Sequence, residues 1–362
     1  AGVYLVARMF PISSFSAPAA LEVVAYVGAF SSLFAAVIAC TQTDIKRVLA
    51  YSTMSQIGYM MFALGGSGYG GHEGLGYMAS MFHLFTHAMF KALLFLGAGA
   101  IIHAVHSNHM TEMGGLRKYL PITHITFLIA CMTIAGIYPL SGFFSKDEIL
   151  AAAFHHNKFL FAIEYAVAGL TAFYMFRLYF SVFWGTDRHY HHTPHEAPFT
   201  MTFPLIFLAI ASIFTGFIPF NELVTSDGKP FETELELIIA IPSVLIGLLG
   251  IGIAYVMYKK ETDIPYRLSK SLKYTYKWAY NKFYIDELYL FVTKKIIFRY
   301  ISTPIAWFDR HIVDGTMNSI AAVTQGVSFR IKEFQSGQLQ KYAFIFVTGA
   351  VMIAILLIYL WK

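Results

Sequence analysis

Residues 81–95 read MFHLFTHAMFKALLF and place two histidines and one lysine inside an otherwise apolar helical run. At about 100° per residue, His83, His87 and Lys91 drift only about 80° around a helix while rising about 12 Å. The three side chains therefore share one polar stripe. A charged lysine at the centre of a membrane span costs at least about 2.5–3.5 kcal/mol, so Lys91 must be neutral, paired or hydrated and must face the protein interior.

A row of this kind is suited to moving protons. Histidine changes charge near neutral pH and burial disfavours a charged lysine, so water molecules between these groups could pass protons along the row. One histidine alone is usually a hydrogen-bonded core residue, and zinc binding by His83 and His87 is a sharper alternative. The sequence offers no third ligand nearby, so we expect no metal.

The composition of the whole chain indicates a membrane protein. It is 57% hydrophobic and 13% charged, whereas soluble domains are about 25% charged. The net charge is only +5 and the basic residues lie in loops and near the C-terminal third, so no nucleic-acid partner is expected. Cys40 and Cys131 have no spacing partner, and neither a disulfide nor an iron–sulfur or zinc site is expected.

Several apolar runs are long enough to cross a hydrocarbon core, which takes about 20 helical residues. They lie near residues 17–41, 44–65, 73–103, 121–154, 157–185, 200–220, 234–258 and 342–361. These runs predict an all-α, polytopic transmembrane helix bundle of about eight spans. The first residues, AGVYLVARMF, show no signal-peptide pattern and read as the end of a helix already in progress, so we expect a longer protein.

The charges of the connecting segments alternate from one side of the predicted membrane to the other. One side carries Lys46, Arg47, Arg117, Lys118, Arg188 and the basic stretch from Lys259 to Lys282. The other side carries Lys158 and Lys229 among Glu222, Asp227, Glu232, Glu234 and Glu236. The positive-inside rule places the first set in the cytoplasm.

Residues 121–154 are too long for one straight span, since a helix of that length would reach about 50 Å. Gly136, Pro139, Ser141 and Gly142 lie in the middle of this run and predict a broken helix, the structure that marks ion sites in transporters. A kink that serves packing is the alternative. The sequence GFFSKDEIL then places Lys146, Asp147 and Glu148 directly after the break.

Two other spans carry polar side chains. Span 44–65 has polar residues at helical spacing, which could hold water beside the stripe or simply pack between helices; these are Ser52, Ser55, Gln56 and Tyr59. Lys46, at its cytoplasmic start, is either interfacial or part of the relay. In span 157–185, we expect Arg177 to pair with a carboxylate or carbonyl, whereas the role of Glu164 stays open. The loop at 186–196 resembles a metal-binding tract only by composition, and we interpret it as solvated; its histidines are His189, His191, His192 and His195.

Residues 285–336 contain charges too closely spaced for a crossing, among apolar residues that recur at threes and fours. This pattern predicts an amphipathic lateral helix along a surface, about 75 Å long if fully helical. A helix of that length would extend past its own bundle and touch neighbouring subunits. Pro304, Gly315 and Gly326 favour bends, and a set of shorter interfacial helices is the alternative. We divide the chain into a bundle at 1–260, a basic connector with the lateral helix at 261–341, and an anchor span at 342–362.

Four motifs resemble one known family. TDIKRVLAYSTMSQIGYM, FHLFTHAMFKALLF, MGGLRKYLP and GFFSKDEIL look like the antiporter-type subunit L of bacterial respiratory complex I, the equivalent of mitochondrial subunit 5. The final QSGQLQKYAFIFVTG and last span resemble its C-terminal anchor. The resemblance implies a proton-translocating membrane-arm subunit of an NADH:quinone oxidoreductase, with the lateral helix on the cytoplasmic face of the bacterial inner membrane.

The resemblance also assigns roles. It identifies Lys91 as the central proton lysine, His83 and His87 as its companions, Lys146 with Asp147 as the broken-helix site, and Lys46 as the lysine that opens the preceding helix. Ser52, Ser55, Tyr59 and Glu148 are possible channel-lining residues. Flavin, iron–sulfur clusters and quinone are expected on other subunits, and none on this chain.

Members of that family normally carry an inverted repeat whose first half precedes the point where this chain begins. One incomplete channel is therefore expected here. The large subunit of a multisubunit sodium/proton antiporter or of a membrane-bound hydrogenase shares the buried motifs and is one alternative. A structural clamp of the membrane arm, acting mainly through residues 285–336, is another.

Overall fold

The computed structural model describes residues 1–69, 74–188, 190, 192–225, 227–230 and 236–361, and the regular elements of these residues are helices. The chain divides into two compact units, Ala1–Phe283 and Tyr284–Lys362. The all-α fold class is therefore as predicted.

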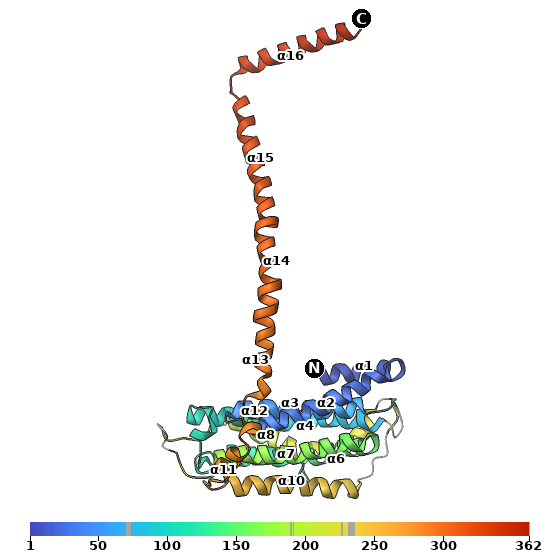
Figure 1. Cartoon of the computed structure of the whole chain (residues 1–362), viewed down its shortest axis with the longest axis vertical. Helices are drawn as coiled ribbons and strands as arrows, with labels where there is room; N and C mark the ends of the chain where they lie inside the picture. The colour runs from blue at the N-terminus through green and yellow to red at the C-terminus, as the bar shows by residue number, and fades with distance from the viewer. Residues whose placement is uncertain (70–73, 189, 191, 226, 231–235, 362) are drawn as a thin grey trace. The chain divides into compact units, whose positions relative to one another are not determined.

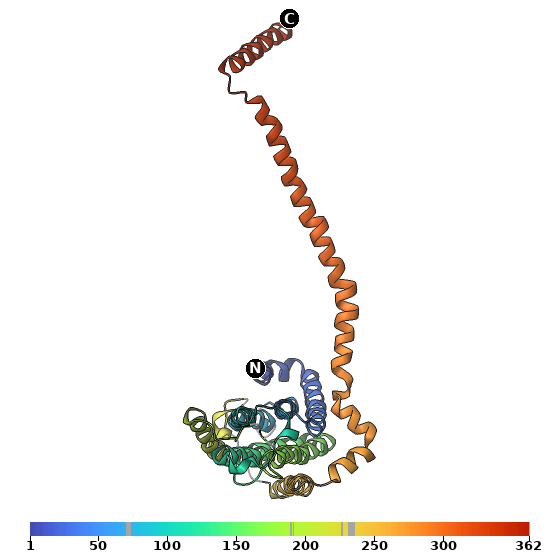
Figure 2. The ribbon, with the colours of Figure 1, turned by 90° about the vertical axis from the view of Figure 1, so that its left-hand side faces the viewer.

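The first unit is a bundle whose long helices lie side by side, as Figure 1 shows from the side and Figure 2 nearly end-on. Its main helices are α1 (Gly2–Ser16), α2 (Pro18–Ala39), α3 (Ile45–Gly65), α4 (Leu75–Val105), α5 (Pro121–Ala135), α6 (Ser141–His156), α7 (Lys158–Phe183), α8 (Phe199–Phe214) and α10 (Leu237–Tyr258). Shorter helices are α9 (Phe220–Leu223), α11 (Ile264–Ser271) and α12 (Lys273–Tyr280).

In the described part of the chain, six helices are long and apolar enough to cross a membrane. They are α2, α4, α7, α8 with its following turn, α10 and α16 (Leu339–Leu360). The predicted span at 44–65 forms α3, whose apolar character is diluted by Ser52, Ser55 and Gln56. The predicted span at 121–154 forms the separate helices α5 and α6, of 15 and 16 residues. Length and composition thus support fewer spans than the about eight expected from the apolar runs.

The connecting segments gather at two ends of the bundle in the way the charge alternation predicts. At the basic end, the backbones of Asp44 and His109 form an isolated antiparallel β-bridge. Lys118 lies 3.6 Å from Asp187, and Arg188 lies 3.0 Å from Glu261. At the opposite end, His155 Nε2 lies 2.7 Å from Glu236 Oε1. Glu232 and Glu234, which the prediction assigned to this second end, lie outside the described residues.

The helix break predicted in residues 121–154 is present. α5 ends at Gly136, whose φ of 77° is a left-handed conformation that favours glycine. α6 begins at Ser141, and a Cβ on Gly142 would overlap the Thr133 carbonyl oxygen of α5. The chain can therefore pass from α5 into α6 with this close backbone approach only because residue 142 has no side chain, and the approach brings Lys146 to the end of α5.

The second unit contains the predicted lateral helix, which runs without interruption from Ile285 to Phe334. Its parts are α13 (Ile285–Leu290), a π-helical segment (Phe291–Ser302), α14 (Thr303–Phe308), a second π-helical segment (Asp309–Val313) and α15 (Asp314–Phe334). The alternative of shorter helices is wrong, because Pro304, Gly315 and Gly326 do not interrupt it. The wider π winding ends just before Pro304, which lacks the N–H that a regular turn would use there.

Glycines let α2 and α3 pack with their backbones in contact. A Cβ on Gly58 would lie 2.6 Å from the Ser32 amide nitrogen and 2.7 Å from the Gly28 carbonyl oxygen. Small residues allow this close approach of helices in membranes. The contact fixes the position of Ser32 and of the polar face of α3.

We predict that Gly58→Ala lowers the thermal midpoint of the detergent-solubilised protein, because the added methyl group must push α2 and α3 apart, at a cost of about 1–3 kcal/mol. Gly99→Ala on α4 is the matched control, since a Cβ there meets nothing within 4 Å. That change should leave the midpoint equal or higher. Equal midpoints for the two variants would show that the backbone contact does not limit stability.

Candidate functional site

Lys91, at the middle of α4, is buried and is held by hydroxyl groups. Its Nζ donates a hydrogen bond of 2.7 Å to Ser52 Oγ of α3. Tyr174 of α7 donates to the same Ser52 oxygen at 3.1 Å. Lys91 forms no ion pair with the acidic side chains that the structure describes. A buried amine with neutral partners can give up or accept a proton without breaking an ion pair.

Further hydrogen bonds continue from Tyr174 toward α4 and α3. The Tyr174 hydroxyl also lies 3.4 Å from Thr171 Oγ1, and Gln56 Nε2 donates to that threonine oxygen at 3.5 Å. The other end of the Gln56 amide, Oε1, lies 3.0 Å from His83 Nε2. Since the carbonyl end of an amide can only accept, His83 carries a proton on Nε2 in this arrangement.

The second ring nitrogen of His83 reaches the broken helix. Nδ1 lies 2.8 Å from Ser145 Oγ of α6, and Ser145 in turn lies 2.9 Å from Thr86 Oγ1 of α4. With Nε2 protonated, Nδ1 accepts from the serine hydroxyl. A buried polar line therefore joins Lys91 to the residue that directly precedes Lys146. We call it the polar line; its members are Lys91, Ser52, Tyr174, Thr171, Gln56, His83 and Ser145.

Lys146 is placed by the helix break. Its Nζ donates a hydrogen bond of 2.5 Å to the carbonyl oxygen of Ile134 in the last turn of α5. The last carbonyls of a helix have no partner within it and carry partial negative charge, so they favour an ammonium group. Lys146 also interacts electrostatically with Lys91, His83 and His87. A positive charge on Lys91 therefore disfavours a positive charge on Lys146, and the reverse.

His87 lies beside the polar line but is not joined to it. Its ring centroid is 6.1 Å from that of His83, and its buried Nε2 has no hydrogen-bond partner among the described protein atoms. Tyr59 OH and Asp147 Oδ1 are buried without a partner in the same sense. Because buried polar atoms are nearly always hydrogen-bonded, these positions are suited to water molecules.

The remaining predicted site residues lie apart from the polar line. Lys46 is exposed at the basic end, beside a shallow cavity that His103 and His106 also line. Ser55 donates to the backbone carbonyl of Ser32 on α2 at 2.9 Å, which is the interhelical packing role weighed for it. Asp147 is buried and Glu148 is half-buried on α6.

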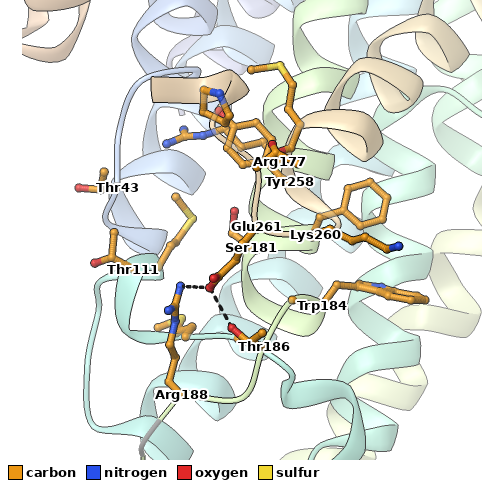
Figure 3. Close-up of a pocket in the computed structure, with 18 residues that line it drawn as sticks. Thr43, Thr111, Arg177, Ser181, Trp184, Thr186, Arg188, Tyr258, Lys260 and Glu261 are labelled. Carbon is orange, nitrogen blue, oxygen red and sulfur yellow. Dashed lines mark hydrogen bonds and ion pairs between the residues drawn. The ribbon is translucent and has the colours of Figure 1, made fainter. Parts of the chain in front are cut away.

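Arg177 pairs with a carbonyl, one of the two partners expected for it. Its guanidinium donates to the Ala39 carbonyl oxygen at 3.4 Å and lies 5.6 Å from the centre of the Tyr258 ring. It lines a pocket at the basic end of the bundle, in which Arg188 and Thr186 both contact Glu261 (Figure 3). Glu261 thus engages two of the polar groups of this pocket.

The histidine-rich loop has a structural contact. Glu196 caps the start of α5, where its carboxylate accepts from the Ile122 and Thr123 amides at 2.7 and 3.2 Å. His192 and His195 are exposed, while His189 and His191 lie outside the described residues. No group of His, Cys, Asp or Glu within the described ranges is arranged to hold a metal ion.

Several members of the polar line were not predicted as site residues. Gln56 shares its helical face with Ser52 and Tyr59, so the pattern had pointed to its position but not to its role. Thr171 and Tyr174 lie one turn apart on α7, and Ser145 adjoins Lys146. The sequence gives no sign of which helix face each meets, so only the packing of α3, α4, α6 and α7 could join them.

Comparison with known proteins relates this arrangement to a family. The family model described as NADH:quinone oxidoreductase/Mrp antiporter, TM, matches residues 1–171, which contain every member of the polar line except Tyr174. Residues 1–171 resemble this family, and the whole chain is similar to subunit 5 proteins over most of its length. The subunit 5 proteins among its relatives confirm the resemblance that the four motifs suggested.

Two curated relatives illustrate the match. The chain is 42% identical to NAD(P)H-quinone oxidoreductase chain 5 of Picosynechococcus sp. over 97% of its own length and 58% of the relative. It is 41% identical to chloroplastic NAD(P)H-quinone oxidoreductase subunit 5 of Mesostigma viride, over 94% of this chain and 55% of that one. The chain thus spans little more than half the length of these relatives.

Solved structures share the fold. A chain of the Mrp complex from Dietzia sp. DQ12-45-1b superposes with a TM-score of 0.61 and 18% identity, covering 99% of this chain and 36% of that chain. A chain of the membrane-bound sulfane sulfur reductase, an archaeal respiratory membrane complex, gives 0.61 and 23%, covering 92% and 56%. Antiporter-like chains of multisubunit membrane complexes therefore share this architecture.

We predict that Gln56→Leu, which keeps the side-chain volume, lowers the free energy of unfolding by about 1–3 kcal/mol, because His83 and Thr171 lose a buried partner. Thermal unfolding in detergent measures this loss. Thr53→Val, on the same helix, is the control, since Thr53 donates only to the Leu49 carbonyl of its own helix. A loss no greater for Gln56→Leu than for Thr53→Val would mean that the Gln56 bonds contribute no net stability.

Proposed function

We propose that this chain is a proton-translocating membrane-arm subunit of an NADH:quinone oxidoreductase of the complex I type. The observation that carries this proposal is the polar line, which joins a buried lysine at the middle of α4 to the lysine site at a broken helix. Groups arranged in this way can exchange protons but give no space for a larger substrate. The chain itself would perform no redox step.

In this mechanism, Lys91 and Lys146 hold protons alternately. Two ammonium groups about 10 Å apart repel by about 1.7 kcal/mol at an effective dielectric constant of about 20, which changes a protonation equilibrium more than tenfold. Loading one lysine therefore favours release from the other. The driving force would come from quinone reduction elsewhere in the complex, transmitted as a change of charge next to this chain.

Each predicted site residue has a part in this mechanism. Ser52, Tyr174 and Thr171 orient the Lys91 end, His83 and Ser145 link to the Lys146 end, and His87 supports water beside the line. Asp147 and Tyr59 are expected to contact water near Lys146, and Glu148 to line its approach. Lys46, exposed at the basic end, is proposed to act at the mouth of the path. Ser55 is proposed to keep α3 against α2.

The surroundings of the chain follow from the same proposal. Flavin, iron–sulfur clusters and quinone would be bound by other subunits. The basic end of the bundle would face the cytoplasm across a bacterial inner membrane, because it gathers the lysine- and arginine-rich connections. The helix 285–334 would lie on that face and contact neighbouring membrane-arm subunits, and α16 would return into the lipid. Subunit 5 relatives from cyanobacteria support the bacterial setting.

Two alternative functions have specific support. The family also includes Mrp antiporters, whose large subunit would use the same buried groups for sodium/proton exchange. The uninterrupted lateral helix supports a mainly structural role as a clamp of the membrane arm. The 42% identity to a subunit 5 protein over 97% of this chain favours the quinone oxidoreductase.

We predict that Lys91→Met in the assembled complex lowers the number of protons translocated per electron by at least about twofold, since methionine fills the space but cannot carry a proton. Proton uptake by proteoliposomes during quinone reduction measures this ratio. Lys229→Met, in an exposed loop, is the control and should keep the ratio. An unchanged ratio in Lys91→Met would contradict the proposed path.

The clamp alternative makes a different prediction. If residues 285–362 acted in proton transfer and not as a clamp, their deletion should leave assembly normal and lower the number of protons translocated per electron. We expect the opposite: less assembled complex on native gels, with a normal proton ratio in the complexes that remain, because the polar line lies entirely within residues 52–174. A lowered ratio in assembled complexes would place part of the path in the deleted segment.

A further inference from the structure

Glu164 of α7 is an ionisable residue that the polar line does not include. Its side chain is fully buried, with 0% exposure, in the interior half of a membrane-spanning helix. Oε1 accepts a hydrogen bond of 2.8 Å from Ser32 Oγ of α2. Oε2 is buried and has no hydrogen-bond partner among the described protein atoms. A buried carboxyl group with one satisfied oxygen is costly to retain and indicates a functional position.

The surroundings of Glu164 contain one cation. Glu164 interacts electrostatically with Lys146, and both side chains are buried. Tyr59 of α3 belongs to the same cluster, because its ring lies 6.0 Å from Lys146 Nζ and its hydroxyl interacts with Glu164. Tyr59 OH also lacks a partner among the described atoms. Polar groups of four helices, α2, α3, α6 and α7, therefore belong to this cluster.

The packing of the bundle fixes this cluster. The glycine contact between Gly58 and the Ser32 backbone holds the Ser32 hydroxyl in place for Glu164. Lys146 is tied by the Ile134 carbonyl on its other side. A residue that served only to join helices would be expected to satisfy both carboxyl oxygens, whereas Glu164 Oε2 has no partner among the described protein atoms.

We propose that Glu164 is the counter-charge of Lys146 and exchanges its proton. In one state Lys146 is an ammonium and Glu164 a carboxylate. In the other, Lys146 has given its proton to an intervening water molecule, which has passed one of its own to Glu164, so that both groups are neutral. The two states have the same number of protons and the same net charge. This inference rests on the proposed function and adds a second proton-holding position, between α2 and α7, to the Lys146 site.

The consequence is a branch in the path. A proton that reaches Lys146 can stay on the line of α4 and α6 or move to Glu164, next to Ser32 and Tyr59. Because the exchange conserves charge inside the cluster, it can occur while Lys91 is charged. Glu164 therefore lets the Lys146 site retain its proton within the bundle when Lys91 is loaded.

The test uses the complete complex reconstituted into vesicles. Glu164→Gln keeps the size of the side chain and can still accept from Ser32, but it can neither ionise nor take up a proton. We expect at least a twofold fall in protons translocated per electron, and partial recovery in Glu164→Asp. Glu22→Gln, an exposed acid on α2, is the matched control and should keep the ratio.

The outcomes separate this inference from the proposed function. A fall in both Lys91→Met and Glu164→Gln supports both proposals. A fall in Lys91→Met with an unchanged ratio in Glu164→Gln overturns the role of Glu164 and leaves the proposed function standing. An unchanged ratio in Lys91→Met overturns the proposed function. In that case the carbodiimide labelling of Glu164 tests its pairing with Lys146.

Pairing is measured independently of transport. If Glu164 balances Lys146, Lys146→Gln must make Glu164 neutral, and a hydrophobic carbodiimide, which reacts with protonated carboxyl groups, should label Glu164 severalfold more than in the unaltered complex. Peptide mass spectrometry quantifies this label and needs no change at Glu164, so it applies even if Glu164→Gln fails to assemble. Equal labelling in the two complexes would overturn the pairing.

Discussion

The hydrogen bond from Lys146 to the Ile134 carbonyl depends on a constraint that governs the whole bundle: in hydrocarbon, every backbone polar group needs a partner. Breaking the helix at Gly136 leaves carbonyl groups of α5 without the partners that a continuous helix would supply. The Lys146 ammonium satisfies one of them, and that carbonyl in turn makes the buried ammonium tolerable. Neither the break nor the lysine would be stable at this depth without the other.

The same constraint explains why the hydrogen-bond partner of Lys91 is a hydroxyl group. A carboxylate partner would stabilise the ammonium form strongly and hold the proton there. Ser52, shared by Lys91 and Tyr174, offers instead a neutral hydroxyl that can serve as donor or acceptor. Glu164, in contrast, interacts electrostatically with Lys146. The chain thus separates a lysine with neutral partners from a lysine with an acid nearby.

The membrane class, the helix break and the buried basic residues were predictable from the sequence, because each follows from a local rule. Apolar length indicates a span, Gly136 and Pro139 interrupt a helix, and a lysine within a span must face inward. The route between the lysines was not predictable. It passes through Gln56, Thr171 and Tyr174, whose meeting depends on how α3 and α7 rotate about their axes. That rotation is set by contacts such as Gly58 against Ser32, which no periodicity in one helix reveals.

The Gln56 amide gives the polar line a property that hydroxyl groups alone would not. A hydroxyl passes a proton on by accepting one and donating another, but a primary amide accepts only at its oxygen and donates only at its nitrogen. Gln56 faces His83 with its oxygen and Thr171 with its nitrogen. A proton therefore cannot pass through Gln56 between the His83 side and the Thr171 side of the polar line. Conduction between them requires a bypass, and the free nitrogen of His87 lies beside His83, where a water molecule could supply one. Entry of a water molecule into the space beside His83 would therefore connect the two segments of the polar line, without movement of a helix.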